Sequence, residues 1–228
     1  MSRSTQAAAL LAVLVAACHR PPAPAAALPT SGTVATAQAE PSFAARAVSP
    51  IAEATPLQVV SVFAYEPGEQ LISPATEIAS FVADARVKQG YGQQALQPLL
   101  VAPKPVSIKA DRLLVIAWGK RSEFSLERVK EVGRTAMRET LKMGVDEMAY
   151  APIARDQGVT SIAPGDVAAA FVEGALGEYL TERGVDPSAL LRLRRVTFEA
   201  GPTFVDSVAK AIPRGVEAAR AHASDVGR

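Results

Sequence analysis

The sequence contains very few of the residues that most often build catalytic and metal sites. Its 228 residues include one cysteine, Cys18, and two histidines, His19 and His222. A single cysteine excludes an intrachain disulfide and a metal cluster held by several thiolates. With no histidine between positions 19 and 222, no histidine-based triad or metal site is expected in the core. We therefore expect no metal ion, no cofactor and no catalytic residue.

The chain also has no excess of charge of either sign. Lysine and arginine total 24 and aspartate and glutamate total 23, so the formal net charge is +1. This balance offers no electrostatic attraction to nucleic acid, and we expect no nucleic acid partner. Aromatic residues make up only 5% of the chain, but hydrophobic residues make up 49%. That content is enough for one substantial core, which favours a single folded domain.

A short apolar segment near the N-terminus predicts export. Residues 7–17 are all alanine, leucine or valine and follow one positive charge, Arg3. This pattern is typical of a signal peptide, and it is shorter than the roughly 20 residues of a membrane-spanning helix. Val15-Ala16-Ala17-Cys18 resembles the bacterial lipobox, in which small residues precede a cysteine that becomes acylated. The sequence therefore predicts a signal peptide over residues 1–17 and lipidation of Cys18.

Lipidation at Cys18 would make the membrane the first partner of this protein. More than one acyl chain gives stable anchoring, whereas a single chain would be marginal. We expect an exported lipoprotein of a bacterial cell envelope that faces the periplasm. The alternative is an ordinary secretory signal followed by an incidental cysteine.

Residues 18–56 are predicted to form a disordered tether after the lipidated cysteine. They are rich in alanine and proline and have almost no large apolar side chains. Such a composition cannot bury enough surface to offset the entropy of ordering, and its prolines favour extended conformations. The folded domain is therefore predicted over residues 57–228.

An alternation of strands and helices is predicted in the folded domain. Its strongest element is Leu113–Trp118, an unbroken apolar run typical of a strand that is covered on both faces. The predicted strands are 59–65, 106–108, 113–118, 145–151 and 191–198. The predicted helices begin at Ser73-Pro74, Ser125, Pro164 and Pro202 and end near Gly90, Gly144, Gly184 and His222. This order indicates an α/β fold with a mostly parallel central sheet between helical layers.

Trp118, Gly119 and Lys120 are the best candidates for a small-molecule site. They follow the apolar strand at its carboxyl end, where open α/β sheets usually place ligands. The alternative is that Trp118 packs in the core and Lys120 faces solvent.

Several other groups of residues are better explained without a ligand. Asp146 and Glu147 are predicted to be a solvated turn at the start of a strand rather than an acid/base pair. Arg192, Arg194 and Arg195 are predicted to protect an edge strand. A helix rich in alanine and glycine, residues 168–177, is predicted to pack within its own domain rather than at a subunit interface.

Taken in order, these elements resemble the N-terminal domain of the M17 leucyl aminopeptidases. The resemblance covers residues 57–221 and rests on the order of these elements. The matching stretches are Val59–Phe63, Pro74 with its helix, Leu113-Leu114-Val115-Ile116-Ala117-Trp118-Gly119-Lys120, the charged amphipathic helix after Ser125, the helix Ala168–Ala175 with Tyr179, the pair Thr197-Phe198, and Arg214-Gly215-Val216-Glu217-Ala218-Ala219. The resemblance implies a macrodomain-like fold in three layers.

The same resemblance limits the function that can be expected. In that family two metal ions are held by a separate C-terminal domain, and no stretch of this sequence matches its metal-binding motif. We therefore expect a non-catalytic module that acts through a protein partner or through self-association. Two alternatives stay open: an accessory subunit of a two-chain M17 metallo-aminopeptidase, and a lipoprotein that binds a nucleotide or an ADP-ribose-like ligand.

Overall fold

The computed structural model describes residues 39–64, 78, 82–85, 88, 90–102, 104–185 and 192–226. The chain divides into two units, residues 1–37 and 38–228, and the second holds every element described below. The predicted signal peptide, Cys18 and the first part of the predicted tether lie outside the described residues. No helix among the described residues is long and apolar enough to cross a membrane.

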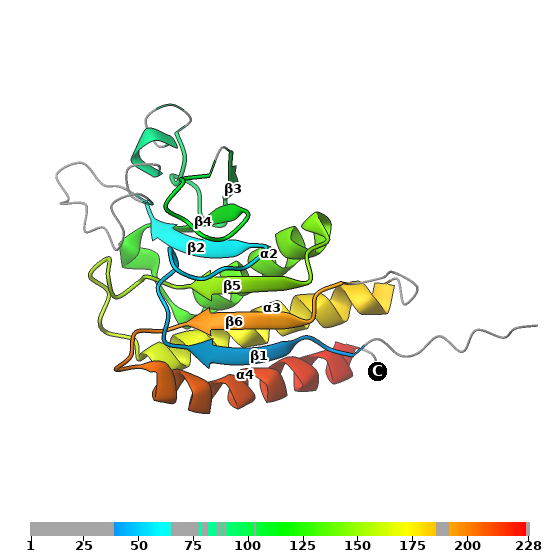
Figure 1. The fold of residues 1–228 in the computed structure, drawn as a ribbon. Helices are drawn as coiled ribbons and strands as arrows, with labels where there is room; N and C mark the ends of the chain where they lie inside the picture. The colour runs from blue at the N-terminus through cyan, green and yellow to red at the C-terminus, as the bar shows by residue number, and fades with distance from the viewer. Residues whose placement is uncertain are drawn as a thin grey trace, which may run out of the picture. The chain divides into compact units, whose positions relative to one another are not determined.

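The described residues form a six-stranded sheet in the order β1-β6-β5-β2-β4-β3. Its strands are β1 (Ser42–Arg46), β2 (Gln58–Phe63), β3 (Pro98–Val101), β4 (Leu113–Gly119), β5 (Glu147–Ala151) and β6 (Arg195–Glu199). All neighbouring pairs are parallel except β3 and β4, which are antiparallel. The carboxyl ends of β1, β6, β5, β2 and β4 therefore meet at one edge of the sheet (Figure 1).

Three long helices cover one face of this sheet. They are α2 (Leu126–Met143), α3 (Pro164–Val185) and α4 (Val205–Val226), and a short 3₁₀ helix, η1 (Arg121–Glu123), precedes α2. Helix α2 begins where the Ser125 hydroxyl accepts a hydrogen bond from the Arg128 amide, 3.2 Å away. It ends at Gly144, whose φ of 63° is the left-handed conformation that glycine adopts readily. Both ends were predicted from sequence.

The opposite face carries a second apolar cluster. Val60 of β2 and Val115 of β4 pack there with Ile78 and Val82, which lie in helical segments, and with Ile108 from the loop before β4. The sheet thus lies between two covering layers. This arrangement confirms the predicted α/β fold with a mostly parallel sheet flanked by helices.

The predicted tether is wrong over its last part, because residues 42–46 form an edge strand of the sheet. The Ser42 amide donates to the Arg194 carbonyl at 2.9 Å, and the Ala200 amide donates to the Arg46 carbonyl at 2.9 Å. The strand is short and only half-buried on alternate residues, so it carries almost no apolar signal. Its order comes from backbone pairing with β6, which composition does not reveal.

The same strand corrects a second prediction. Arg195 begins β6, and β6 lies between β1 and β5 rather than at an edge. The arginine therefore does not protect an edge, and its guanidinium is paired with the Glu147 carboxylate.

A third prediction placed a strand at residues 106–108, directly before the strand that is β4. That segment is a turn, and the antiparallel partner is Pro98–Val101. Pro98 disfavours a strand in the middle of a sheet, but β3 is the last strand in the sheet order, and an edge position tolerates a proline that cannot donate a ladder hydrogen bond.

Helix α3 packs against both α2 and α4 through glycines that let the backbones approach closely. A Cβ atom on Gly174 would collide with the carbonyl oxygen of Lys130 in α2. A Cβ atom on Gly215 of α4 would likewise collide with the carbonyl oxygen of Ala169 in α3. Ala168 and Ala175 are buried nearby, so Ala168, Gly174 and Ala175 serve packing within the domain, as predicted.

This packing predicts opposite effects for two alanine substitutions on α3. Gly174→Ala must push α2 away and is expected to lower the free energy of unfolding by about 1–3 kcal/mol. Gly177→Ala is the matched control, because no atom lies within 4 Å of its Cβ position. It should raise stability by about 0.4–1 kcal/mol by restricting the unfolded chain. Chemical denaturation measures the free energy of unfolding of both variants. Equal changes in that free energy for Gly174→Ala and Gly177→Ala would contradict the close packing of α3 against α2.

Candidate functional site

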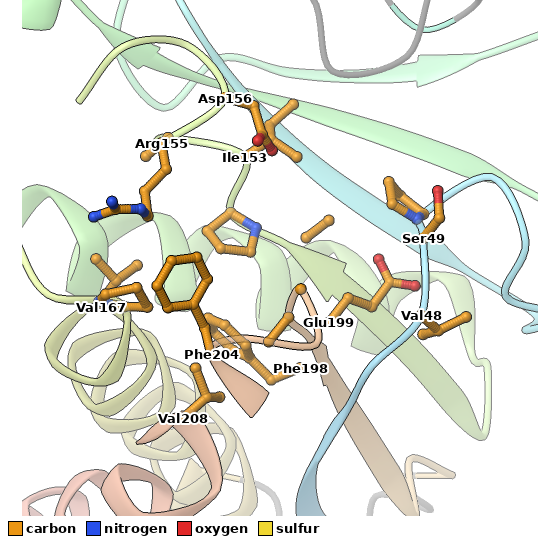
Figure 2. Close-up of a pocket in the computed structure, with 17 residues that line it drawn as sticks. Val48, Ser49, Ile153, Arg155, Asp156, Val167, Phe198, Glu199, Phe204 and Val208 are labelled. Carbon is orange, nitrogen blue, oxygen red and sulfur yellow. The ribbon is translucent and has the colours of Figure 1, made fainter. Parts of the chain in front are cut away.

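A cavity opens at the carboxyl ends of β1, β5 and β6. We call it the strand-end cavity, and its volume is about 290 Å³. It is lined by residues 48–50 after β1, by residues 151–156 from the last residue of β5 onward, and by residues 198–201 and 204 from the end of β6 and the loop that follows it. Pro164 and Val167 from the start of α3 and Val208 from α4 complete it (Figure 2). The cavity is at the lower end of the roughly 300–1,000 Å³ typical of small-molecule sites.

Aromatic side chains form much of the apolar lining. Phe198 belongs to a buried cluster in which its ring meets Tyr150 edge-on at 5.5 Å and Phe171 at 6.0 Å. Phe204 stands closer to solvent, and the Arg155 guanidinium lies over its ring at 4.9 Å from the centroid. The cavity therefore has a fixed apolar floor and one aromatic wall that carries a cation.

The loop after β5 is held in an unusual conformation. Ile153 has a φ of 38°, a left-handed value that strains a β-branched residue. Gln157 holds the loop in place: its Nε2 donates to the carbonyls of Ser61 and Ile153 at 3.0 and 3.1 Å, and its Oε1 accepts from the Phe63 amide at 2.9 Å. These bonds join the loop to the end of β2.

Glu199 supplies a buried carboxyl group at this cavity. It is the last residue of β6 and is only 3% exposed. Gln58 Nε2 donates to its Oε2 at 2.8 Å, while its Oε1 has no hydrogen-bond partner among the described residues. Burial raises the pKa of Glu199 to about 8, and the nearby Glu53 carboxylate adds to the rise. Gln58 and the Arg46 guanidinium oppose it.

A second carboxyl group, that of the largely exposed Asp156, lines the cavity from the loop after β5. Burial raises the pKa of Asp156 above its ordinary value, and the adjacent Arg155 guanidinium lowers it in part. The cavity is thus lined by two carboxyl groups, Glu199 and Asp156, and one guanidinium group, Arg155.

The predicted ligand residues lie elsewhere on the same edge of the sheet. Trp118 is 1% exposed and packs against Phe124 edge-on at 5.0 Å, with Phe63 stacked at 6.1 Å. Gly119 ends β4, and Lys120 is exposed. None of the three lines the strand-end cavity, because β2 lies between β4 and β5. A ligand-binding role for them stays a prediction.

Three other acidic residues near the strand and helix ends, Asp146, Glu147 and Asp166, take at least partly solvated positions. Glu147 is partly exposed and paired with Arg195, and Asp146 is exposed in the bend before β5. Asp166 in the first turn of α3 is paired with Arg214 at 2.7 Å. In the part of the chain that the structure describes, no three His, Cys, Asp or Glu side chains are grouped to hold a metal ion.

Sequence reasoning missed Glu199, Phe204 and Ile153 as site residues. The only signal for Glu199 was its position directly after the predicted strand 191–198, where a polar side chain meets the ligand edge of a parallel sheet. Nothing in the sequence indicated that its carboxyl would be buried, because the covering residues belong to the predicted tether. The left-handed conformation of Ile153 has no sequence signal.

The order of the strands, the two covering layers and the strand-end cavity together define the class of this protein. It is a three-layer α/β domain of the macrodomain type. A *Trypanosoma brucei* macrodomain structure matches with a TM-score of 0.54 and 14% identity over 76% of this chain and 66% of that chain. At this identity the likeness shows the fold alone.

Within that class, the chain resembles the N-terminal region of leucine aminopeptidases. It is 30% identical over 180 residues to the probable cytosol aminopeptidase of *Roseiflexus castenholzii*, covering 75% of this chain and 33% of the relative. The tomato leucine aminopeptidase mutant K354E matches with a TM-score of 0.56 and 14% identity, over 76% of this chain and 36% of that one. The chain thus spans about a third of the curated relative's length. No protein-family model matches it.

The raised pKa of Glu199 predicts a specific dependence of stability on pH. A carboxyl group whose pKa is higher in the folded chain than its usual 4.5 favours folding when protonated. This contribution is complete below pH 4.5 and is lost as the pH rises through about 8. Relative to Glu199→Gln, which stays neutral, the wild-type chain should lose stability on the order of a few kcal/mol over this range.

Urea denaturation at pH 5, 7 and 9 measures this difference. Glu147→Gln, on the opposite end of the neighbouring strand, is the control and should follow the wild type apart from a small constant offset. A constant difference between Glu199→Gln and wild type across the range would show that Glu199 titrates normally.

Proposed function

We propose that this chain is an exported, lipid-anchored and non-catalytic interaction module whose α/β domain binds a separate protein. The chain is similar to one region of longer aminopeptidases, and this similarity supports a module that acts together with a separate polypeptide. The apolar segment 7–17 and the lipobox-like Val15–Cys18 support anchoring at Cys18. Binding is assigned to the outer face of the helical layer, for the reasons that follow.

One observation carries the proposal, a hollowed surface along α3 between α2 and α4. We call it the α3 trough. It consists of two hollows of about 660 and 380 Å³, which share Glu173 at their junction. Its floor is formed by the small residues Ala169 and Gly177, which leave the space above α3 open. A trough of this kind between two helices suits the apolar side of a partner's helix.

Charge and apolar groups alternate along the rim of the trough. Lys130 of α2 pairs with Glu173 at 2.9 Å, and that hydrogen bond raises the pKa of Lys130. Val185, at the end of the smaller hollow, is 79% exposed, and Leu126 at the larger hollow is 38% exposed. Exposed aliphatic side chains within a charged rim are typical of a surface that gains stability when covered.

Substitution of Gly177 tests the trough. An arginine at this position would fill the floor without entering the core, because nothing lies within 4 Å of its Cβ position. The tagged full-length protein is purified from detergent-solubilised membranes, and bound proteins are identified by mass spectrometry. We expect a near-stoichiometric protein partner whose recovery falls at least about tenfold in Gly177→Arg.

Ser107→Arg is the matched control, since Ser107 is exposed in the segment that covers the other face of the sheet. It should recover the partner at the wild-type level. Recovery of the protein alone, or equal recovery of the partner with both variants, contradicts the proposal.

The same experiment distinguishes the alternative functions. A partner with an M17 metal-binding domain would make this chain an accessory subunit. Hydrolysis of a leucyl substrate by the purified single chain would overturn the non-catalytic assignment.

Anchoring is tested separately by Cys18→Ser. Removal of the acylated thiol should move the protein from the membrane fraction to the soluble fraction by more than about tenfold, because no other anchor is proposed. Thr30→Ser, within the predicted tether, is the control and should fractionate with membranes. A Cys18→Ser protein that stays in the membrane fraction would show that another element anchors it.

A further inference from the structure

The side chains of Gln58 and Glu199 leave two buried oxygen atoms without a donor. The two residues are joined by one hydrogen bond, which Nε2 of Gln58 donates to Oε2 of Glu199 at 2.8 Å. The other oxygen of each group, Oε1, is buried and has no partner among the described residues. Nε2 of Gln58 also donates to the Val59 carbonyl at 3.3 Å, which fixes the orientation of the amide. Buried polar atoms are paired in most folded proteins, so two exceptions on joined side chains indicate a missing hydrogen atom between them.

We propose that Glu199 carries a proton, which its Oε1 donates to Oε1 of Gln58. The carboxylic acid and the amide then form two hydrogen bonds, and we call this arrangement the acid–amide pair. One proton satisfies both oxygens, because each group offers one donor and one acceptor. The acid–amide pair acts as a latch that keeps residues 47–57 closed over Glu199, and loss of the proton releases them. The latch depends neither on the proposed partner nor on anchoring at Cys18.

Residues 47–57 join β1 to β2, and we call them the cover. Residues 48–50 line the strand-end cavity together with Glu199, and Figure 2 shows Glu199 on the same side of the cavity as Val48 and Ser49. Glu53, near the middle of the cover, is only 7% exposed, and its carboxylate is close enough to raise the pKa of Glu199. The cover therefore lies near Glu199 at two points along its length.

The cover is held to the rest of the domain by few backbone hydrogen bonds. None of its residues belongs to a helix or a strand. The Lys109 amide donates to the Ile51 carbonyl at 3.1 Å, and the Asp111 amide donates to the Thr55 carbonyl at 2.9 Å. Segments of this kind open at a lower free energy than core strands. The cover can therefore open locally while the sheet stays folded.

The charged groups around Glu199 favour its neutral form while the cover is closed. The Glu53 carboxylate raises the pKa of Glu199, and the Arg46 guanidinium of β1 lowers it. Arg46 is already paired with Glu53, so an ionised Glu199 would have to share that guanidinium. The loop after β5 adds Arg155 and Asp156, which are neighbours of opposite charge at the same cavity. A second buried carboxylate would therefore be poorly compensated.

Ionisation of Glu199 is therefore coupled to opening of the cover. Burial raises the pKa of Glu199 to about 8, so the acid–amide pair is intact below this pH. Above it the proton passes to solvent, and only the hydrogen bond from Nε2 of Gln58 remains. Opening brings water to the carboxylate, so the open fraction rises with pH. Because residues 48–50 form one wall of the strand-end cavity, access to that cavity rises as well.

Hydrogen–deuterium exchange of the full-length protein in detergent at pH 6 and pH 9 tests the latch. The amides that report on the cover are those of Ala52 and Glu53, which lie within it, and of Lys109 and Asp111, which donate to it. After correction for intrinsic exchange, their protection factors should fall at least about tenfold from pH 6 to pH 9. Protection of β4 should fall less. An equal fall in both segments, or no fall in the cover, overturns the proposal.

Glu199→Gln is expected to lock the cover closed. A second amide can replace both hydrogen bonds of the acid–amide pair and does not titrate. Protection of the cover in this variant should match the wild type at pH 6 and stay constant to pH 9. Glu147→Gln is the matched control, because its carboxylate is paired with Arg195 away from the cavity, and it should follow the wild type. A fall in Glu199→Gln as large as in the wild type would show that another group titrates.

Gln58→Met distinguishes the acid–amide pair from a single bond to a carboxylate. The pair makes two hydrogen bonds to protonated Glu199 and one to ionised Glu199. Relative to the wild type at the same pH, the substitution should therefore lower protection of the cover more at pH 6 than at pH 9. A larger loss at pH 9 contradicts the shared proton.

Infrared difference spectroscopy keeps the test decisive if Gln58→Met does not fold. Between pH 6 and pH 9 the wild type should lose the band of a protonated carboxyl group, and Glu199→Gln should lack that band. A wild-type protein without this band, or a Glu199→Gln variant that retains it at full strength, shows that Glu199 does not hold the proton.

Discussion

The close approach of three helices is the constraint on which the rest of this domain depends. Helix α3 is buried along most of its surface because it contacts the sheet, α2 and α4 at once, and the strip that lines the α3 trough is left partly exposed. Helix α3 can contact α2 and α4 at once only because two glycines lack a Cβ atom at the contacts. Gly174 of α3 lies against the backbone of α2, and Gly215 of α4 lies against the backbone of α3. This spacing places the start of α3 at the strand-end cavity and its middle at the floor of the α3 trough.

A second constraint comes from the parallel strands themselves. Strands β1, β5 and β6 end at the same edge, so the three loops that follow them converge on one small volume. The convergence buries Glu199 under the segment after β1, while Gln157 holds the loop after β5 against β2. Burial of a carboxyl group and a left-handed Ile153 both cost stability. Their occurrence together at one cavity is more typical of a binding site than of packing alone.

The sequence predicted the parts of the fold whose signals are local. The apolar run Leu113–Trp118 and the cap residues Ser125 and Gly144 lie where the patterns placed them. Strand β1 was missed because Ser42–Arg46 is ordered by pairing with β6, more than 150 residues further along the chain, and not by its own composition. The cavity was missed for the same reason, since its walls come from three loops that are distant in sequence.

Similarity to aminopeptidases and the chemistry of the cavity therefore bear on different questions. Similarity over about a third of a longer relative accounts for the fold and for the packing of the helices. It does not determine what a cavity binds, because one fold hosts many sites. The ionisable side chains that line the cavity are Glu199, Asp156 and Arg155, and the Arg155 guanidinium lies over the Phe204 ring. The ligand of a cavity at the strand ends of a macrodomain-type sheet therefore depends on the residues that line it rather than on the fold.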